Sequence, residues 1–213
     1  MKTSSALAVV ALLGFTAAAP AQSIDPLDDL FARGRAAQAA TKTITAAFTE
    51  TTVSGLLNGP LVATGTIVAA MPVRVVMSYA SPVAKTLALD DKRLLVIWPS
   101  DQRREEIDIA AAQRRVQKYF VDASPRQLRE QFDITLASDL KDAAYRLELV
   151  PKRKQIAEGL MRLRIWIDRT RLVMMKMTMD FPGGDSKTLE LRDVRTNVAI
   201  DESAFAVLAK KPR

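Results

Sequence analysis

The stretch Gly65–Pro99, GTIVAAMPVRVVMSYASPVAKTLALDDKRLLVIWP, decides the fold of this chain. It holds four short apolar runs, which are separated by Met71-Pro72, Ala80-Ser81-Pro82 and Asp90-Asp91-Lys92. Runs of this length with turn residues between them are typical of successive antiparallel strands. Because side chains alternate along a strand, one face of the run after Pro72 would be apolar: Val73, Val75, Met77 and Tyr79. The stretch predicts a curved sheet whose apolar face suits binding better than catalysis.

The chain length and composition indicate one globular domain behind a signal peptide. The chain has 213 residues, of which 48% are hydrophobic and 26% are charged. Lys2, the apolar segment Ala6–Ala18 and Ala19-Pro20-Ala21 are typical of a secretory signal cleaved before Gln22. We therefore expect residues 1–21 to be removed and residues 22–213 to form a single, soluble domain in a bacterial periplasm. No later segment approaches the 18 uninterrupted apolar residues of a membrane helix.

The sequence contains neither cysteine nor histidine. This excludes disulfides, thiolate catalysis, histidine acid–base chemistry and zinc sites built from these residues. A Ser–Lys dyad, a carboxylate pair or an oxygen-liganded metal remain as residual possibilities. The pairs Asp90-Asp91 and Glu105-Glu106 would point to opposite faces of a strand, so they are poor acid–base candidates. We expect no enzymatic activity, no cofactor and no metal.

The net charge of +7 is spread along the chain instead of forming one basic block. A basic surface favours acidic partners. Nucleic acid is a poor candidate, because the three tyrosines do not interleave with a basic patch. Anionic lipid headgroups or an acidic face on a membrane partner fit better. For any single Lys or Arg, a simply solvated position remains an equal alternative.

Three segments have helical patterns. The first runs from Pro26 to about Thr41, with Asp25 as the N-cap. The others are Ala110–Phe120 and Ser124–Phe132, the last with Ser124 as N-cap. The second and third share a narrow apolar stripe, which is typical of helices that lie on an apolar surface: Val116, Phe120, Leu128 and Phe132. These two helices are placed to close a cavity.

Strand patterns occupy most of the remaining chain. They cover Ile44–Val53, Leu61–Ala70, Asp101–Ile109, Tyr145–Pro151, Met161–Ile167, Val173–Phe181 and Lys187–Arg192. In one of these runs Met175, Met177 and Met179 share a face. They would give an adaptable wall for flexible acyl chains, although plain core filling is the commoner use of methionine. The pattern predicts a long antiparallel sheet with helices from one end and from the middle of the chain.

Several motifs, taken in order, resemble the LolA-like periplasmic outer-membrane lipoprotein carrier family. They are Ala46–Glu50 for A-x-F-x-Q, the hairpin Gly65–Met77, the hairpin Asp90–Pro99, Leu149–Lys152 for L-x-P-K, and Asn197–Phe205. The resemblance implies an α+β, mainly β fold: an incomplete antiparallel barrel, or half-barrel, with helices forming a lid over an apolar cavity. It also implies a cargo of acylated lipoprotein or lipid, an inner-membrane exporter or ABC transporter as donor, and an outer-membrane acceptor.

The chain also departs from the family pattern. Met71 stands where the family has an arginine that helps to hold the lid closed, Val75 and Met77 stand at aromatic positions, and Asp91 replaces a glycine. The chain therefore resembles a divergent member, of the kind that would serve a dedicated export pathway for another acyl-bearing lipid or glycolipid.

We predict a monomeric carrier that moves acyl chains from the inner to the outer membrane. The predicted cavity residues are Val73, Val75, Met77, Leu95, Ile97, Met175, Met177 and Met179, and the predicted lid residues are Phe120, Leu128 and Phe132. The alternative is a periplasmic envelope-stress sensor that binds mislocalised lipoproteins and signals through protein contact. A lipid hydrolase is disfavoured by the absence of His, Cys and a G-x-S-x-G elbow.

Overall fold

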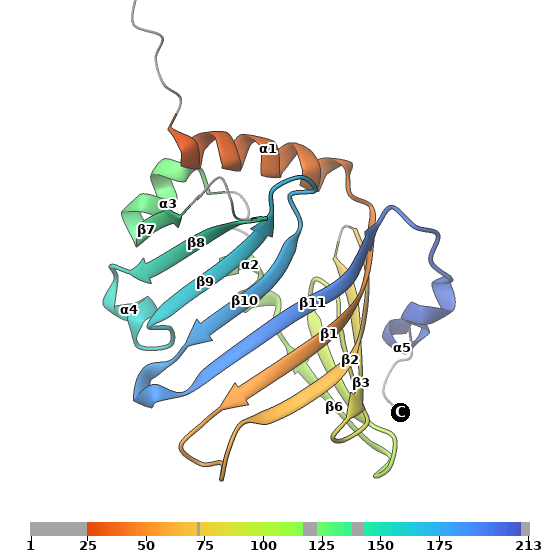
Figure 1. Ribbon diagram of the computed structural model, residues 1–213. Coiled ribbons are helices and arrows are strands. Elements are labelled where there is room, and N and C mark those ends of the chain that lie inside the picture. Colours follow the sequence, from red (N-terminus) through yellow and green to blue (C-terminus); the bar gives the residue numbers. More distant parts are fainter. Residues whose placement is uncertain (1–24, 72, 117–122, 138–142, 210–213) are drawn as a thin grey trace, which may run out of the picture.

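The chain folds around one eleven-stranded sheet with the strand order β6-β5-β4-β3-β2-β1-β11-β10-β9-β8-β7. The computed structural model describes residues 25–71, 73–116, 123–137 and 143–209. Every pair of neighbouring strands is antiparallel. The sheet curves strongly and β6 and β7 remain its two open edges (Figure 1). The predicted open half-barrel of mainly β class is thus confirmed.

The strands and helices have the following bounds. The strands are β1 (Thr43–Val53), β2 (Leu61–Ala70), β3 (Arg74–Ser81), β4 (Lys85–Leu89), β5 (Arg93–Trp98), β6 (Arg103–Asp108), β7 (Phe132–Ala137), β8 (Ala144–Pro151), β9 (Arg162–Asp168), β10 (Met174–Asp180) and β11 (Ser186–Thr196). The helices are α1 (Pro26–Ala40), α2 (Ala110–Val116), α3 (Pro125–Gln131), α4 (Lys154–Ala157) and α5 (Ala206–Ala209), with the 3-10 turns η2 (Pro182–Gly184) and η3 (Glu202–Phe205). Within the described residues, no helix is long and apolar enough to cross a membrane.

The opening stretch forms strands β2 to β5, with breaks where the turn residues predict them. Gly65 of β2 faces Phe48 of β1 on one side and Tyr79 of β3 on the other. A Cβ atom at Gly65 would collide with the carbonyl oxygen of Ser78 and lie 2.8 Å from the Phe48 ring. Glycine is therefore needed here, because the aromatic ring crosses directly over the backbone of β2.

Local capping explains why the helices begin where they do. The Asp25 carboxylate accepts a hydrogen bond from the Leu27 amide at 2.8 Å, which starts α1 at the predicted residue. Ser124 and Gln127 form a capping box at the start of α3. Helix α2 covers the first part of the predicted segment 110–120, whereas Phe120 lies outside the described residues, as do the predicted signal peptide and its cleavage site. Phe132 ends α3 and begins β7, a strand that the sequence patterns did not predict.

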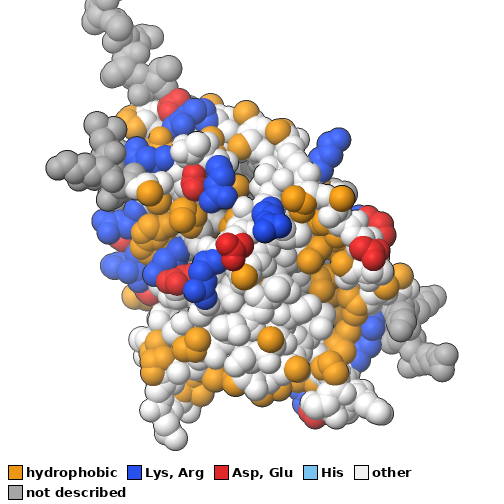
Figure 2. Space-filling model, turned by 45° about the vertical axis from the view of Figure 1, so that its right-hand side comes forward, with side chains coloured by type: hydrophobic (Ala, Val, Ile, Leu, Met, Phe, Trp, Pro, Cys, Tyr) orange, Lys and Arg blue, Asp and Glu red, His pale blue; other side chains and the backbone are white. Residues whose placement is uncertain are grey.

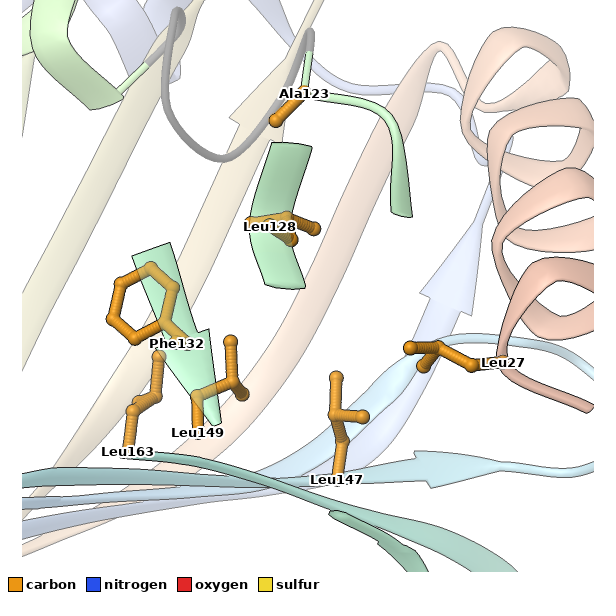
Figure 3. Packing of buried hydrophobic residues seen from close by; sticks show 7 residues of the cluster. All are labelled: Leu27, Ala123, Leu128, Phe132, Leu147, Leu149 and Leu163. Carbon is orange, nitrogen blue, oxygen red and sulfur yellow. The ribbon is translucent and has the colours of Figure 1, made fainter. Parts of the chain in front are cut away.

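The two faces of the sheet carry different cores. The inner face is the one on which α1 and α3 pack, through the seven buried residues drawn in Figure 3: Leu27, Ala123, Leu128, Phe132, Leu147, Leu149 and Leu163. On the outer face, α5 and η3 cover a second cluster: Ala70, Val76, Ala88, Leu95, Phe205 and Leu208. Figure 1 shows α1 and α5 on opposite sides of the sheet. Elsewhere the outer face is polar, with ion pairs such as Arg164–Asp180 at 2.8 Å.

Candidate functional site

An apolar wall runs across the inner face from one edge of the sheet towards the other. Cross-strand pairing aligns one row of side chains over β7 to β11: Leu136, Leu147, Ile165, Met177 and Leu189. It aligns a second row over β1 to β5: Ala46, Ile67, Met77, Leu87 and Val96. Most of these side chains are only partly buried. The inner face therefore offers apolar contact area that the protein itself does not fully cover.

A cavity of about 340 Å³ lies between this wall and helix α1. Its lining comes from α1, β8, β9 and the turn after β9: Leu30, Phe31, Gly34, Arg35, Gln38, Leu147, Ile165, Ile167 and Leu172. At Gly34 there is open space, since no atom lies within 4 Å of the position that a Cβ would take. The two polar side chains, Arg35 and Gln38, are exposed, so they lie at the mouth. The volume falls in the range of about 300–1,000 Å³ of small-molecule sites.

Polar contacts fasten α1 over the cavity. Arg33 donates a hydrogen bond to the Tyr145 hydroxyl at 2.9 Å, and Arg35 donates one to the carbonyl oxygen of Ala123 at 2.7 Å. Arg129 of α3 bridges the start of α1, at 2.6 Å from Asp25 and 3.2 Å from Asp28. Ion pairs this exposed contribute at most about 1 kcal/mol each. These contacts therefore add little to the apolar packing of α1, in which Leu27 and Leu30 are buried.

The predicted lid residues that the structure describes lie on the inner face. Leu128 and Phe132 are 2% and 0% exposed and pack beside Leu149 and Leu163 (Figure 3). Helix α3 therefore covers the β7 end of the wall, as its apolar stripe predicts. The helix that covers the cavity, however, is α1, whose residues the sequence analysis did not assign to the lid. The signal was present, because Leu27, Leu30, Phe31 and Gly34 follow the spacing of one helix face.

The predicted cavity residues lie in several different places. Val75 and Met77 lie on the inner face over β3, and Met177 and Met179 pack against the cluster under α1 and α3. Met175 lies between Met174 and Lys176, where the pairing of β10 with β9 is irregular. Val73 lines a separate hollow of about 350 Å³, together with Asp91, Lys92, Ala110, Gln113 and Arg114. None of the predicted residues is among the lining of the cavity under α1, although Met177 pairs with Ile165 of that lining.

Leu95 and Ile97, which were predicted to line the cavity with Met77, lie on the opposite face of the sheet from Met77. Val96 is in register with Leu87, which is in register with Met77, so the residues on either side of Val96 point to the outer face. Leu95 is 0% exposed there and packs with Phe205 and Leu208. The run Leu94–Ile97 is apolar throughout because α5 and η3 cover its outer face. Such a run carries no alternation from which the inward residues can be read.

A polar group interrupts the apolar wall near the β1–β2 hairpin. The Tyr79 hydroxyl donates a hydrogen bond to Glu50 at 3.0 Å, and the Lys187 ammonium lies 3.4 Å from the same carboxylate. Burial and the neighbouring Glu50 charge raise the pKa of Tyr79, so this hydroxyl stays protonated and remains a donor. The Lys85 ammonium lies 4.4 Å from the centre of the Tyr79 ring. No cluster of carboxylates able to hold a metal ion occurs in the described part of the chain.

Solved structures with this fold come from distant bacteria. An uncharacterized conserved protein from Thermus thermophilus aligns over 89% of this chain and 96% of its own, at a TM-score of 0.56 and 9% identity. A chain of the Pseudomonas aeruginosa MucA/MucB complex aligns over 84% of this chain and 59% of its own, at a TM-score of 0.53 and 18% identity. The Mycobacterium tuberculosis lipoprotein LppX aligns over 84% of this chain and 100% of its own, at a TM-score of 0.52 and 12% identity. These likenesses establish the fold alone.

Sequence comparison supplies the family. Curated protein sequences gave no match to this chain. The family described as outer membrane lipoprotein carrier protein LolA, in contrast, matches residues 39–207, from the last turn of α1 to α5. That match covers the whole sheet, α3 and η3, whereas nearly all of α1 precedes it. The chain therefore belongs to the LolA family of outer membrane lipoprotein carrier proteins.

Proposed function

We propose that this protein is a periplasmic carrier that binds acyl chains of lipoproteins or related lipids and moves them from an inner-membrane exporter to the outer membrane. The observation that carries the proposal is the cavity of about 340 Å³ under α1, which opens beside the partly exposed apolar wall of the inner face. Membership of the LolA family supports the same role. The signal-like N-terminal segment supports a periplasmic location.

The cavity chemistry fits binding without reaction. Among the described residues, its lining has no carboxylate, hydroxyl or lysine side chain, and the polar groups Arg35 and Gln38 lie at the mouth. Each methylene group moved from water into such a site stabilises the complex by about 0.8 kcal/mol. A partly buried acyl chain therefore binds without polar contacts, and no cofactor or energy source is required. Transfer would follow the relative affinities of donor, carrier and acceptor.

Displacement of a fluorescent probe tests acyl binding directly. Bis-ANS would report on the apolar inner face, and added palmitate should displace it. Ile167→Glu places a carboxylate in the cavity lining and should weaken palmitate binding by tenfold or more. Val83→Glu is the matched control, because Val83 is 53% exposed in the turn between β3 and β4. Failure of palmitate to displace the probe, or equal weakening by both variants, would contradict the proposal.

Lipids that co-purify with the periplasmically expressed protein identify the cargo. Mass spectrometry should find acylated lipids or lipoproteins on the wild-type protein and much less on Met177→Glu, whose side chain pairs with Ile165 of the cavity lining. Recovery of no acylated species from either protein would overturn the carrier proposal.

A sensor that signals through protein contact is the second candidate. The MucA/MucB complex supports it, since the same fold there is assembled with a protein. A carrier should release its bound palmitate to acceptor vesicles without any protein partner. A sensor should instead retain the palmitate and bind a protein only in its loaded state.

A further inference from the structure

The end of the β1–β2 hairpin is an exposed apolar tip. Residues 53–62, VSGLLNGPLV, contain no charged side chain. Leu56 is 95% exposed, and four further side chains are 39–48% exposed: Val53, Leu57, Leu61 and Val62. Figure 2 shows several separate hydrophobic side chains along the lower end of the molecule. Large contiguous apolar patches on soluble proteins mark sites that contact a protein, a membrane or a ligand.

The tip is held in place by the neighbouring turn between β10 and β11. Asp185 accepts hydrogen bonds from the Ser54 hydroxyl at 3.0 Å and from the Gly55 amide at 3.1 Å. The Leu57 amide closes the turn by donating to the carbonyl oxygen of Ser54 at 3.0 Å. The two leucines are therefore presented to solvent by a fixed backbone.

The hairpin end is apolar on both faces of the sheet as well as at its apex. Leu61 pairs with Thr52 and Val62 pairs with Thr51, so these two apolar side chains point to opposite faces. A flat protein surface would cover one face and leave the other in water. Hydrocarbon can surround the tip on all sides, which makes the outer region of a lipid bilayer the occupant that removes all of this apolar area from water.

The charges set back from the tip fit a bilayer surface. Lys187 pairs with Thr52, one residue before Val53, and its side chain is 38% exposed. The nearby carboxylate of Asp185 accepts hydrogen bonds from Ser54 and Gly55. The Lys187 ammonium lies 3.4 Å from the Glu50 carboxylate, and at this level it would meet lipid phosphates when the leucines reach the acyl region. Leu61 lies on the same face as Ala63 and Ile67, so the tip continues the apolar inner wall.

We propose that the β1–β2 hairpin tip inserts into the surface layer of anionic phospholipid bilayers, with Leu56 and Leu57 in the acyl region and Lys187 at the phosphates. The wall that holds acyl cargo would then stand with its hairpin end against the membrane. This contact does not depend on cargo in the cavity, so it is tested separately from the carrier function.

Flotation with vesicles of phosphatidylethanolamine and phosphatidylglycerol measures the contact. Replacing both leucines, Leu56→Ser with Leu57→Ser, should lower the vesicle-bound fraction by tenfold or more. Met161→Ser is the control, because Met161 is 53% exposed outside the tip, and it should stay within twofold of wild type. Lys187→Gln, or pure phosphatidylcholine vesicles, should weaken binding several-fold. Palmitate binding by the double variant should be unchanged, which separates loss of the tip from loss of the cavity.

A site-specific label tests insertion itself. Because the chain has no cysteine, Leu56→Cys and Met161→Cys each give a single site for an NBD fluorophore. The label at residue 56 should brighten and shift to the blue on the anionic vesicles, and the label at residue 161 should not. Equal responses at the two sites, or equal flotation of the double variant and wild type, would overturn the proposal. A concentration-dependent dimer that the double variant abolishes would instead assign the tip to a second copy of this chain.

Discussion

At Gly65 strand β2 passes under an aromatic ring of the inner wall. The Phe48 ring lies over this glycine with its edge against Tyr79, at 4.8 Å between ring centres. Gly65→Ala should therefore lower the free energy of unfolding by about 2 kcal/mol, because Phe48 or β3 must move. Gly34→Ala is the control: its Cβ would meet open space within α1, so a gain of about 0.5–1 kcal/mol is expected. Urea unfolding measures both. Equal effects of the two substitutions would show that β2 relaxes freely around Gly65.

Asp168 links the stability of the turn after β9 to pH. The Arg171 amide, which donates to this carboxylate at 2.8 Å, is the main cause that lowers the pKa of Asp168. A pKa lowered by folding stabilises the protein above the ordinary aspartate value of about 3.9, and this stability is lost as the pH falls through the lowered pKa. Asp168→Asn should thus cost about 1 kcal/mol at neutral pH, and the difference from wild type should vanish in strong acid.

Urea titrations at a series of pH values measure this dependence. Asp91→Asn serves as the control, because Asp91 is exposed in a different turn and should show little change over the same range. If the free energies of unfolding of Asp168→Asn and wild type differ by the same amount in acid as at neutral pH, the Asp168 carboxylate is not the source of this pH dependence. The turn matters to the site because it carries Leu172, which lines the cavity.

Single residues were predictable where the two faces of a strand differ. Met77 and Met177 were placed on the inner face because polar residues alternate with them. Leu95 and Ile97 were misplaced because α5, some hundred residues later, buries the other face of β5, which makes both faces apolar. No signal within β5 distinguishes these two cases.

At the scale of elements, the contacts that hold α1 decide how readily the cavity opens. Arg129→Gln removes the bridge from α3 to Asp25 and Asp28, and Arg35→Gln removes the contact to Ala123. Because these contacts are exposed, the double variant should lose less than about 2 kcal/mol of stability. Palmitate should nevertheless leave several-fold faster, since these contacts hold α1 over the cavity. Stopped-flow fluorescence of release into acceptor vesicles measures the rate.

A control for this variant lies on the same helix. Arg126 is 91% exposed and pairs only with Glu130 of α3 among the contacts that the structure gives it, so Arg126→Gln should leave the release rate unchanged. If Arg126→Gln and the double variant speed palmitate release equally, then the loss of surface charge controls release, and the contacts that hold α1 do not.

Element boundaries were predictable where local chemistry sets them. Asp25-Pro26 and Ser124-Pro125 start helices through caps that the sequence displays, and prolines and aspartates end the strands between Gly65 and Pro99. Strand β7 was missed because Phe132–Ala137 follows α3 without a turn, and its pairing partner β8 lies beyond an intervening segment. The covering role of α1 was missed for a related reason. An apolar stripe indicates that a helix packs against the protein, but it does not identify the strands on which the helix packs.

At the scale of the whole molecule, the sequence predicted an open antiparallel sheet but not its central seam. Strand β1 pairs with both its neighbour in sequence, β2, and the last strand, β11. This long-range pairing joins two meanders into one continuous wall, and no local pattern specifies it. The cavity under α1 depends on the seam, because α1 precedes β1 in sequence but packs on β8 and β9, which reach β1 only through β10 and β11.

Hydrogen exchange should reveal the same organisation as a gradient of local stability. Strand β6 is exposed along nearly its whole length and pairs on one side only, so its amides should exchange fastest among the strands. Amides of β1 and β11, paired on both sides in the centre, should exchange slowest.

Palmitate that binds only the folded protein stabilises the elements around it. Its addition should therefore slow exchange in α1, β8 and β9 and leave β6 unchanged. Protection of β6 and α1 to the same extent would mean that the ligand acts on the whole fold and does not bind in the cavity under α1.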